Sequence, residues 1–218
     1  MKPGKTEASA QLSRAKLELA RRRRFEAMSG ISFLAGAAQF LLVNTVAQSL
    51  YAGYSVSNQT LGELGVGQTA LLWNVSLLLL GAAVILGGYF ALRSLGRRLT
   101  SSLAFVLGAA SIGAAAVPLN LSADVHWWFT FVAFASGGLL AVTSYRVVAS
   151  KWMRIFSIIL GGYSLVAFVL YITATYLGIG VGGMERMVAI PIMLWLSIFS
   201  GFLLHTVPGE YLDRELLR

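Results

Sequence analysis

The residues best suited to chemistry lie in one stretch, residues 122–131. Asp124 and His126 stand two positions apart there, and Trp127 and Trp128 follow directly. An imidazole near a carboxylate can move protons, and paired tryptophans are typical of a membrane surface. Glu63 and the pair Glu185 and Arg186 place further acids in two other expected connections. The stretch therefore predicts an acid–base site assembled from several connections.

Candidate roles follow from these residue types. Asp124, His126 and Glu63 are candidate catalytic groups for proton transfer. Glu185 and Arg186 are candidate ligand-binding residues, with Arg186 holding an anionic group. Asn44, Gln48 and Asn74 join this candidate ligand-binding set, because each is a polar residue in an otherwise apolar segment.

Simpler interpretations stay open for the same residues. Asp124 suits a helix N-cap or the first turn of a helix, and Glu185 with Arg186 suits an ion pair at a helix entrance. Asp124 can orient His126 only from a position before the first helical turn, because residues two apart do not share a helix face. Glu63, Asp124, His126 and Glu185 would also suit a divalent metal. A single histidine fits zinc poorly, however, so no metal and no other cofactor is predicted.

The segments that must position these residues are long and apolar. The chain of 218 residues is 57% hydrophobic and only 12% charged, with a mean hydropathy of +0.74, whereas about a quarter of a soluble domain is charged. A helix needs about 20 apolar residues to cross a bilayer. Six segments meet that length approximately, so the predicted fold is an all-α membrane bundle with spans at 30–50, 69–92, 101–119, 126–149, 155–177 and 187–206.

The placement of positive charge predicts the topology. Eight of the 17 Lys and Arg lie in residues 1–29, and the others flank alternate connections or the C-terminus, with Arg186 as the exception. The positive-inside rule then places both termini in the cytoplasm of a cell membrane. This distribution explains the net charge of +8 without a nucleic-acid partner. The absence of cysteine excludes disulfides and thiolate chemistry.

Three regions are expected along the chain. Residues 1–29 form a basic segment whose later part favours a helix, residues 30–206 form the membrane domain, and residues 207–218 form a cytoplasmic tail. The run Arg21, Arg22, Arg23 and Arg24 is a candidate site for anionic lipid head groups, although a plain topology signal explains it too. The basic helix also offers a surface for a protein partner. The small residues of 101–119 predict a close-packed central helix.

Several short motifs resemble a known family. They are Leu61-Gly62-Glu63-Leu64-Gly65 followed by Leu72-Trp73-Asn74, then Asp124-Val-His126, and Gly183-Met-Glu185-Arg186 before Leu194-Trp195. Their order resembles domain-of-unknown-function family 998, a group of prokaryotic six-helix membrane proteins, from residue 30 to about residue 206. The resemblance implies the six-helix fold and directs attention to one membrane face. It implies no reaction.

The polar residues of that face predict a function. Their concentration in the outer halves of the spans predicts an outward-facing polar pocket that binds a lipid or a small amphiphile. The hypothesis has two forms: the protein only binds this ligand, or it also catalyses a reaction on it. A structural or assembly subunit of a membrane complex is the alternative. A small transporter is a further alternative, although its charged groups would be expected at mid-membrane.

Overall fold

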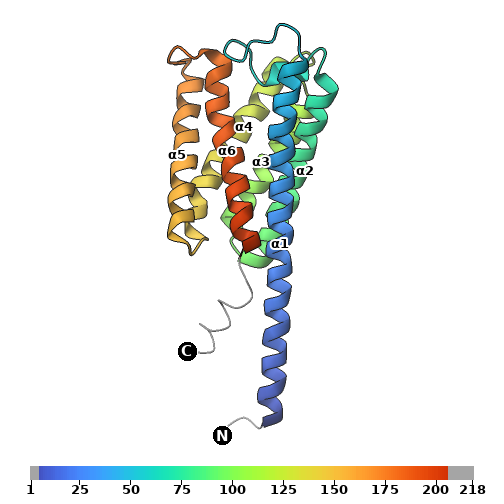
Figure 1. Ribbon diagram of the computed structural model, residues 1–218, viewed down its shortest axis with the longest axis vertical. Helices are drawn as coiled ribbons and strands as arrows, with labels where there is room; N and C mark the ends of the chain where they lie inside the picture. The colour runs from blue at the N-terminus through green and yellow to red at the C-terminus, as the bar shows by residue number, and fades with distance from the viewer. Residues whose placement is uncertain (1–4, 206–218) are drawn as a thin grey trace.

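Residues 5–205, the range that the computed structural model describes, form six long helices joined by short connections (Figure 1). The helices are α1 (Lys5–Leu50), α2 (Ala70–Leu95), α3 (Arg98–Ala116), α4 (Ala123–Thr143), α5 (Lys151–Ile172) and α6 (Gly180–His205). Short 3-10 segments, η1 (Gly62–Gly65) and η2 (Ser144–Arg146), follow α1 and α4. Within this range each long helix has a stretch of the length and hydropathy needed to cross a membrane, so the expected all-α membrane class is confirmed.

The first helix runs further than the predicted spans imply. The basic N-terminal segment and the first span form one uninterrupted helix, α1, so the limit expected between residues 29 and 30 falls inside it. Residues 5–20, here called the projecting segment, extend below the other helices (Figure 1). At about 1.5 Å per residue the projecting segment is about 24 Å long. The predicted tail at 207–218 lies outside the described residues.

The last helix begins seven residues earlier than predicted. The expectation that Glu185 and Arg186 belong to a connection is wrong, because α6 begins at Gly180 and both residues are helical. The backbone N–H groups of Gly182 and Gly183 donate to the Ser57 carbonyl, at 2.9 and 3.3 Å. A carbonyl from another connection thus caps the new helix, which offsets the poor helix propensity of glycine.

The helices form a closed ring. Each packs against its neighbours in the chain, and α6 packs against α1 and also contacts α4 (Figure 1). The expectation that the small-residue third helix lies centrally is wrong: α3 packs mainly between α2 and α4. In the apolar stretch of α6, 56% of the residues are buried, against 50% in α3. Large side chains explain this, because Trp195 and Phe199 of α6 stack inside the bundle at 4.9 Å between ring centroids.

Hydrogen bonds and one backbone contact fix the helix pairs. Gln39 of α1 donates to the Ser76 carbonyl of α2 at 2.9 Å, and the Ser76 hydroxyl donates back to Gln39 Oε1 at 2.8 Å. Between α2 and α3 the backbones themselves meet, since a Cβ on Gly81 would lie 2.5 Å from the Gly108 carbonyl oxygen. Such close approach replaces the hydrophobic effect as the source of helix association in lipid.

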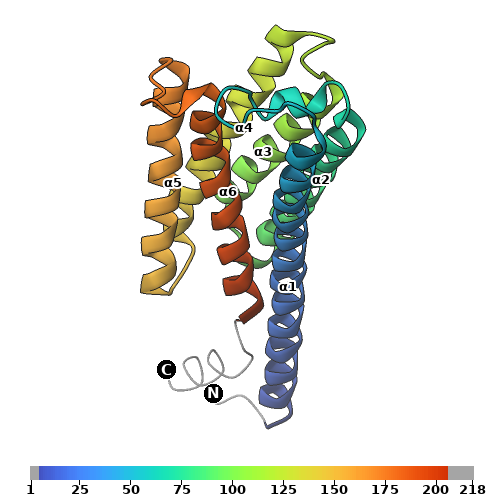
Figure 2. The same cartoon turned by 45° about the horizontal axis from the view of Figure 1, so that its top comes forward.

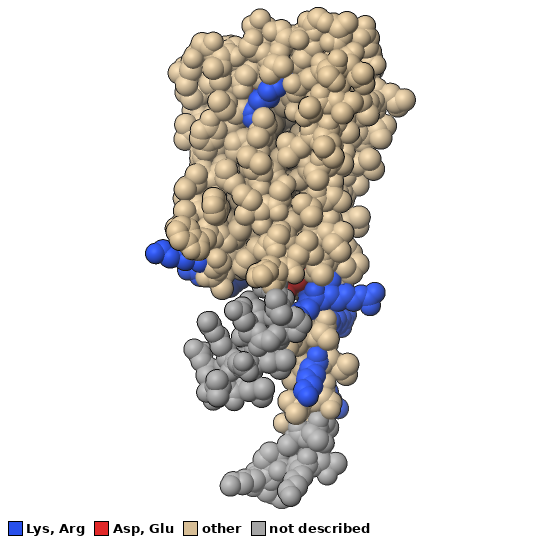
Figure 3. Space-filling model, in the orientation of Figure 1, with Lys and Arg blue, Asp and Glu red and all other residues tan. Residues whose placement is uncertain are grey.

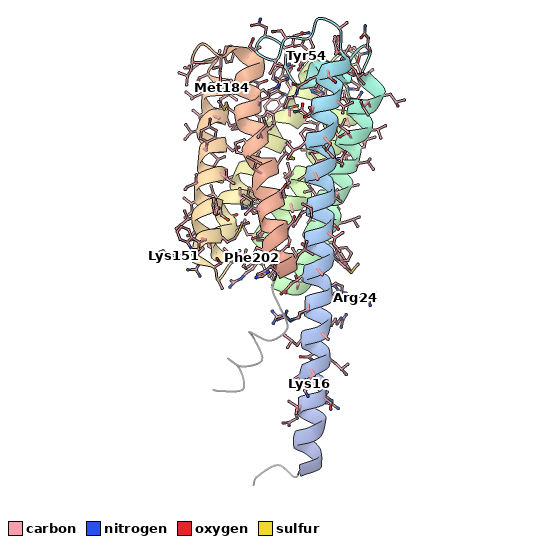
Figure 4. The ribbon with its side chains drawn as sticks, viewed as in Figure 1. Lys16, Arg24, Tyr54, Lys151, Met184 and Phe202 are labelled. Atoms are coloured by element: carbon pink, nitrogen blue, oxygen red, sulfur yellow. The ribbon has the colours of Figure 1, made fainter. Side chains whose placement is uncertain are left out.

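The two ends of the bundle differ in charge. Tyr54 and Met184 mark the upper end, while Lys151 and Phe202 mark the lower end (Figure 4). On the face seen in Figure 3, Lys and Arg gather at the lower end and on the projecting segment, and a single small basic patch appears near the top. The residues predicted to do chemistry belong to the upper end.

Candidate functional site

The upper end is covered by the connection between α1 and α2, residues 51–69. It crosses the bundle from α1 towards α6 (Figure 2). Gly182 lies directly under this connection, because a Cβ there would overlap the carbonyl oxygens of Val56 and Gln59. The connection is therefore seated on the first turn of α6, and its backbone determines what the acids and the arginine of this end can contact.

Arg186 holds the connection in place. Its Nη1 donates to the carbonyls of Val56, at 2.9 Å, and Gln59, at 3.2 Å, and its Nη2 donates to the Tyr54 hydroxyl at 2.7 Å. The side chain is 7% exposed. Burial raises the pKa of the Tyr54 phenol, and the adjacent Arg186 guanidinium opposes that rise. The guanidinium that was predicted to bind an anion is thus surrounded by carbonyl and hydroxyl oxygens of its own chain.

The acids Glu185 and Glu63 bond to the same connection. Glu185 is 3% exposed, and its Oε2 accepts the backbone N–H of Leu61. Glu63 accepts the Thr60 N–H at 3.0 Å and the Gln59 side-chain amide at 3.0 Å. The Glu63 carboxylate therefore stabilises the turn that contains it. The structure does not place Glu63 on the central cavity or the lateral groove described below.

His126 has a defined orientation and tautomer. Its Nδ1 lies 3.0 Å from each of the carbonyl oxygens of Ala114 and Val117, and the side chain is 6% exposed. Because both neighbours are acceptors, Nδ1 carries the proton and Nε2 is left as an acceptor. Nε2 faces the connection, since a Cβ on Gly62 would lie 2.7 Å from it.

His126 and Glu185 line one space, here called the central cavity. It has a volume of about 70 Å³ and lies among α1, α2, α3, α4 and α6, under Leu61 and Gly62. Its other lining residues are apolar apart from Ser111 and Thr130. This volume is larger than a single water molecule needs, so the cavity can hold water. When the Glu185 carboxyl group is protonated, it can pass that proton through water to the acceptor nitrogen of His126 in such a space.

Asp124 belongs to a different space. It is exposed in the first turn of α4, while Ser122 occupies the N-cap position, so the N-cap interpretation of Asp124 is wrong. Since Nδ1 of His126 bonds two carbonyls, the expected pairing with Asp124 is not formed there. Asp124 instead lines a space of about 640 Å³, here called the lateral groove, together with Trp127, Trp128, Thr130, Phe131, Phe134, Phe168, Tyr171, Ile172, Ala174, Tyr176 and Val181.

The lateral groove was not predicted as a site. Trp127, Phe131 and Phe134 recur at helical spacing along α4 and face Phe168 and Tyr171 of α5. This spacing is the sequence signal that would have revealed it. Thr130 and Phe134 line both the lateral groove and the central cavity. Within residues 5–205 the buried Tyr171 hydroxyl has no hydrogen-bond partner.

The remaining predicted ligand-binding residues bond within the chain. Gln48 donates to Asn44 Oδ1 at 2.6 Å along α1, and Asn74 donates to the Gly65 carbonyl at 3.0 Å. Asn74 thereby ties α2 to η1. Neither contact leads into the central cavity or the lateral groove.

The arginine run near the lower end divides by helix face. The Arg21 guanidinium stacks over the Phe25 ring at 5.7 Å, and Arg24 is exposed. Arg22 and Arg23 face a separate pocket beside the end of α2. In the described part of the chain, no three His, Asp or Glu side chains lie close enough together to hold a metal ion.

Comparison with known proteins gives a family and no activity. No curated protein and no solved structure matches the chain. The family described as "Protein of unknown function (DUF998)" matches residues 34–201, which contain all the motifs that carried the resemblance. The match covers more than half of the chain and nearly all of the helical bundle, and the chain therefore belongs to the DUF998 family.

Proposed function

We propose that this integral membrane protein binds the apolar part of a lipid or another amphiphile in the lateral groove. The observation that carries the proposal is a hollow of about 640 Å³ walled by aromatic rings between α4 and α5. Binding sites for small molecules have volumes of about 300–1,000 Å³, with apolar walls and few polar groups. Trp127 is 41% exposed and Trp128 is 68% exposed, so the groove opens outward from the bundle.

The polar groups of the lateral groove support an amphiphilic ligand. Asp124 is exposed at the upper rim, where the head of an amphiphile would meet water. Tyr171 contributes its ring to the wall, where it packs against Trp127 and Phe134. The groove thus joins one charged group at its rim to aromatic walls, as an amphiphile requires.

Action on the ligand would require a movement. The proton-exchanging groups His126 and Glu185 line the central cavity, and Phe134 and Thr130 stand between that cavity and the lateral groove. Rotation of the Phe134 ring would join the two spaces. Binding is therefore the proposed function, and catalysis by His126 is its extension.

The binding proposal is tested by filling the lateral groove. Val181 lines it, whereas Val166 is 63% exposed on α5 outside it. Delipidated protein in detergent would be titrated with a brominated phospholipid while tryptophan fluorescence is recorded. We expect saturable quenching for the wild type and for Val166→Phe, and an affinity about tenfold lower for Val181→Phe. Quenching that never saturates, or identical curves for all three proteins, would contradict the proposal.

A structural or assembly role is the second candidate, and the projecting segment favours it. This helix extends about 24 Å beyond the bundle, and its side chains from Gln11 to Glu18 are exposed. Its exposed side chains include Leu12 and Leu17 as well as charged groups, and an unpartnered helix of this kind suits a partner-binding element. Removal of residues 2–20 should shrink the native complex in a detergent extract by far more than the mass of those residues. A loss equal to their mass would exclude this candidate.

We infer a cell-membrane location with the lower end in the cytoplasm. The support is the excess of Lys and Arg at that end and on the projecting segment (Figure 3). Positive charge is retained on the cytoplasmic side during insertion.

A further inference from the structure

A pocket of about 220 Å³ lies at the lower end, where α1 leaves the bundle. It is here called the arginine pocket. It is lined by α1 between Leu19 and Glu26, by the end of α2, by Arg97 just before α3 and by Val147 just after η2. Its polar lining consists of Arg22, Arg23, Glu26, Ser94 and Arg97. It is far from the lateral groove along the chain and at the opposite end of the bundle.

Positive charge dominates the arginine pocket. Among the described residues that line it, guanidinium groups of Arg22, Arg23 and Arg97 outnumber the single carboxylate of Glu26. The surplus of charge favours an anion. The Arg22 Nε donates to the Ser94 carbonyl at 3.2 Å, which orients its planar guanidinium against the end of α2. Oriented guanidinium groups bind phosphate oxygens in pairs.

The arginine pocket also has aliphatic walls. Leu19, Leu95 and Val147 complete its lining. It adjoins the membrane-spanning part of the bundle: Phe25, next to Glu26 on α1, stacks with Phe90 of α2 at 6.1 Å between centroids. A phosphate joined to the acyl chains of a lipid would satisfy both kinds of wall.

We propose that the arginine pocket binds a phosphate-bearing anion, the head group of an anionic phospholipid or a soluble phosphate. This assignment selects among the four consecutive arginines. Arg22 and Arg23 line the pocket, whereas Arg21 stacks on Phe25 and Arg24 lies outside the lining. Arg97, more than seventy residues away in the sequence, joins the pair. The site does not depend on the lateral groove.

The test removes charge inside and outside the arginine pocket. Full-length protein in nanodiscs of phosphatidylcholine would be titrated with phosphatidylglycerol, and the bound lipid counted by native mass spectrometry. The double variant Arg22→Gln/Arg97→Gln loses two pocket charges. The control Arg14→Gln/Arg24→Gln also loses two exposed charges from the same end, but neither of them lines the pocket. At roughly a factor of five per basic residue, we expect about 30-fold weaker binding for the pocket variant and less than threefold for the control.

A second variant, with the opposite expected effect on binding, separates loss of the site from misfolding. Glu26→Gln removes the pocket's negative charge, so phosphatidylglycerol should bind several-fold more tightly, an effect that damage to the fold cannot produce. Competition by millimolar inorganic phosphate identifies a soluble phosphate as the ligand, and absence of competition identifies the lipid. Equal losses in the pocket and control variants, or weaker binding in Glu26→Gln, would overturn the proposal.

Discussion

Arg186 shows how the surroundings of a residue change its role. Sequence reasoning treats a lone cation at the upper end as an anion ligand, whereas the folded chain surrounds it with the oxygens of residues 54–59 and of Gly182. All of these partners except Gly182 come from about 130 residues earlier in the chain. No local sequence pattern contains that information. The position of Arg186 near the upper membrane surface was therefore predictable, and its hydrogen-bond partners were not.

Replacement of Arg186 should destabilise the upper end strongly. Arg186→Gln leaves several buried oxygens without donors, and hydrogen bonds to charged groups contribute about 1.5–3 kcal/mol each. We expect a loss of at least about 3 kcal/mol in the free energy of unfolding, seen as a lower midpoint of thermal unfolding in detergent. Arg24→Gln, at an exposed position, should change it by less than about 0.5 kcal/mol. Equal midpoints for the two variants would show that Arg186 does not hold the connection.

Gly62 and His126 should be energetically coupled. A methyl group on Gly62 would lie 2.7 Å from His126 Nε2 and 3.2 Å from Leu119 Cδ1. Gly62→Ala should therefore cost about 1–3 kcal/mol in the wild type and distinctly less in a His126→Ala background. Thermal unfolding of the four proteins in this cycle measures the coupling. Additive effects would mean that the imidazole does not face Gly62.

At the scale of elements, the apolar segments predicted the helices correctly. The glycines before residue 187 led to a wrong prediction of where α6 begins. The six spans follow from run lengths alone. The glycines at 180, 182 and 183 predicted a connection because glycine disfavours helix. The structure requires glycine at 180 and 182, because the backbone of residues 56–59 leaves no room for a Cβ there, and the N–H groups of Gly182 and Gly183 donate to the Ser57 carbonyl that caps α6. The direction in which each candidate side chain points was less predictable, because it depends on how residues 51–69 pack on the first turn of α6.

The glycine contact between α2 and α3 gives a prediction for helix packing. Gly108→Ala would bring a Cβ to 2.6 Å from the Gly81 carbonyl oxygen, so the helices must separate. We expect a loss of about 1–3 kcal/mol in stability. Gly162→Ala is the matched control, since a Cβ there meets nothing within 4 Å; it should be neutral or stabilise by up to about 1 kcal/mol. Denaturation in detergent compares the variants, and a harmless Gly108→Ala would argue against direct backbone contact.

At the scale of the whole molecule, the chain offers a clean topology experiment. It has no cysteine, so single cysteines report their own position. Asn58 in the upper connection and Ala149 before α5 are both exposed and lie at opposite ends. In intact cells we expect an impermeant maleimide to label Asn58→Cys and to spare Ala149→Cys until the membrane is permeabilised. The reverse pattern would invert the inferred orientation.

The seating of residues 51–69 on α6 has a consequence for biogenesis. This connection leaves the ribosome early, whereas Glu185 and Arg186, which satisfy its backbone, are synthesised more than 120 residues later. At about 5–20 residues per second, the delay is roughly 6–25 seconds. During that interval the upper connection lacks its partners, so a ribosome stalled between α5 and α6 should leave residues 51–69 sensitive to protease. Completion of α6 then closes the ring and ends that vulnerable period.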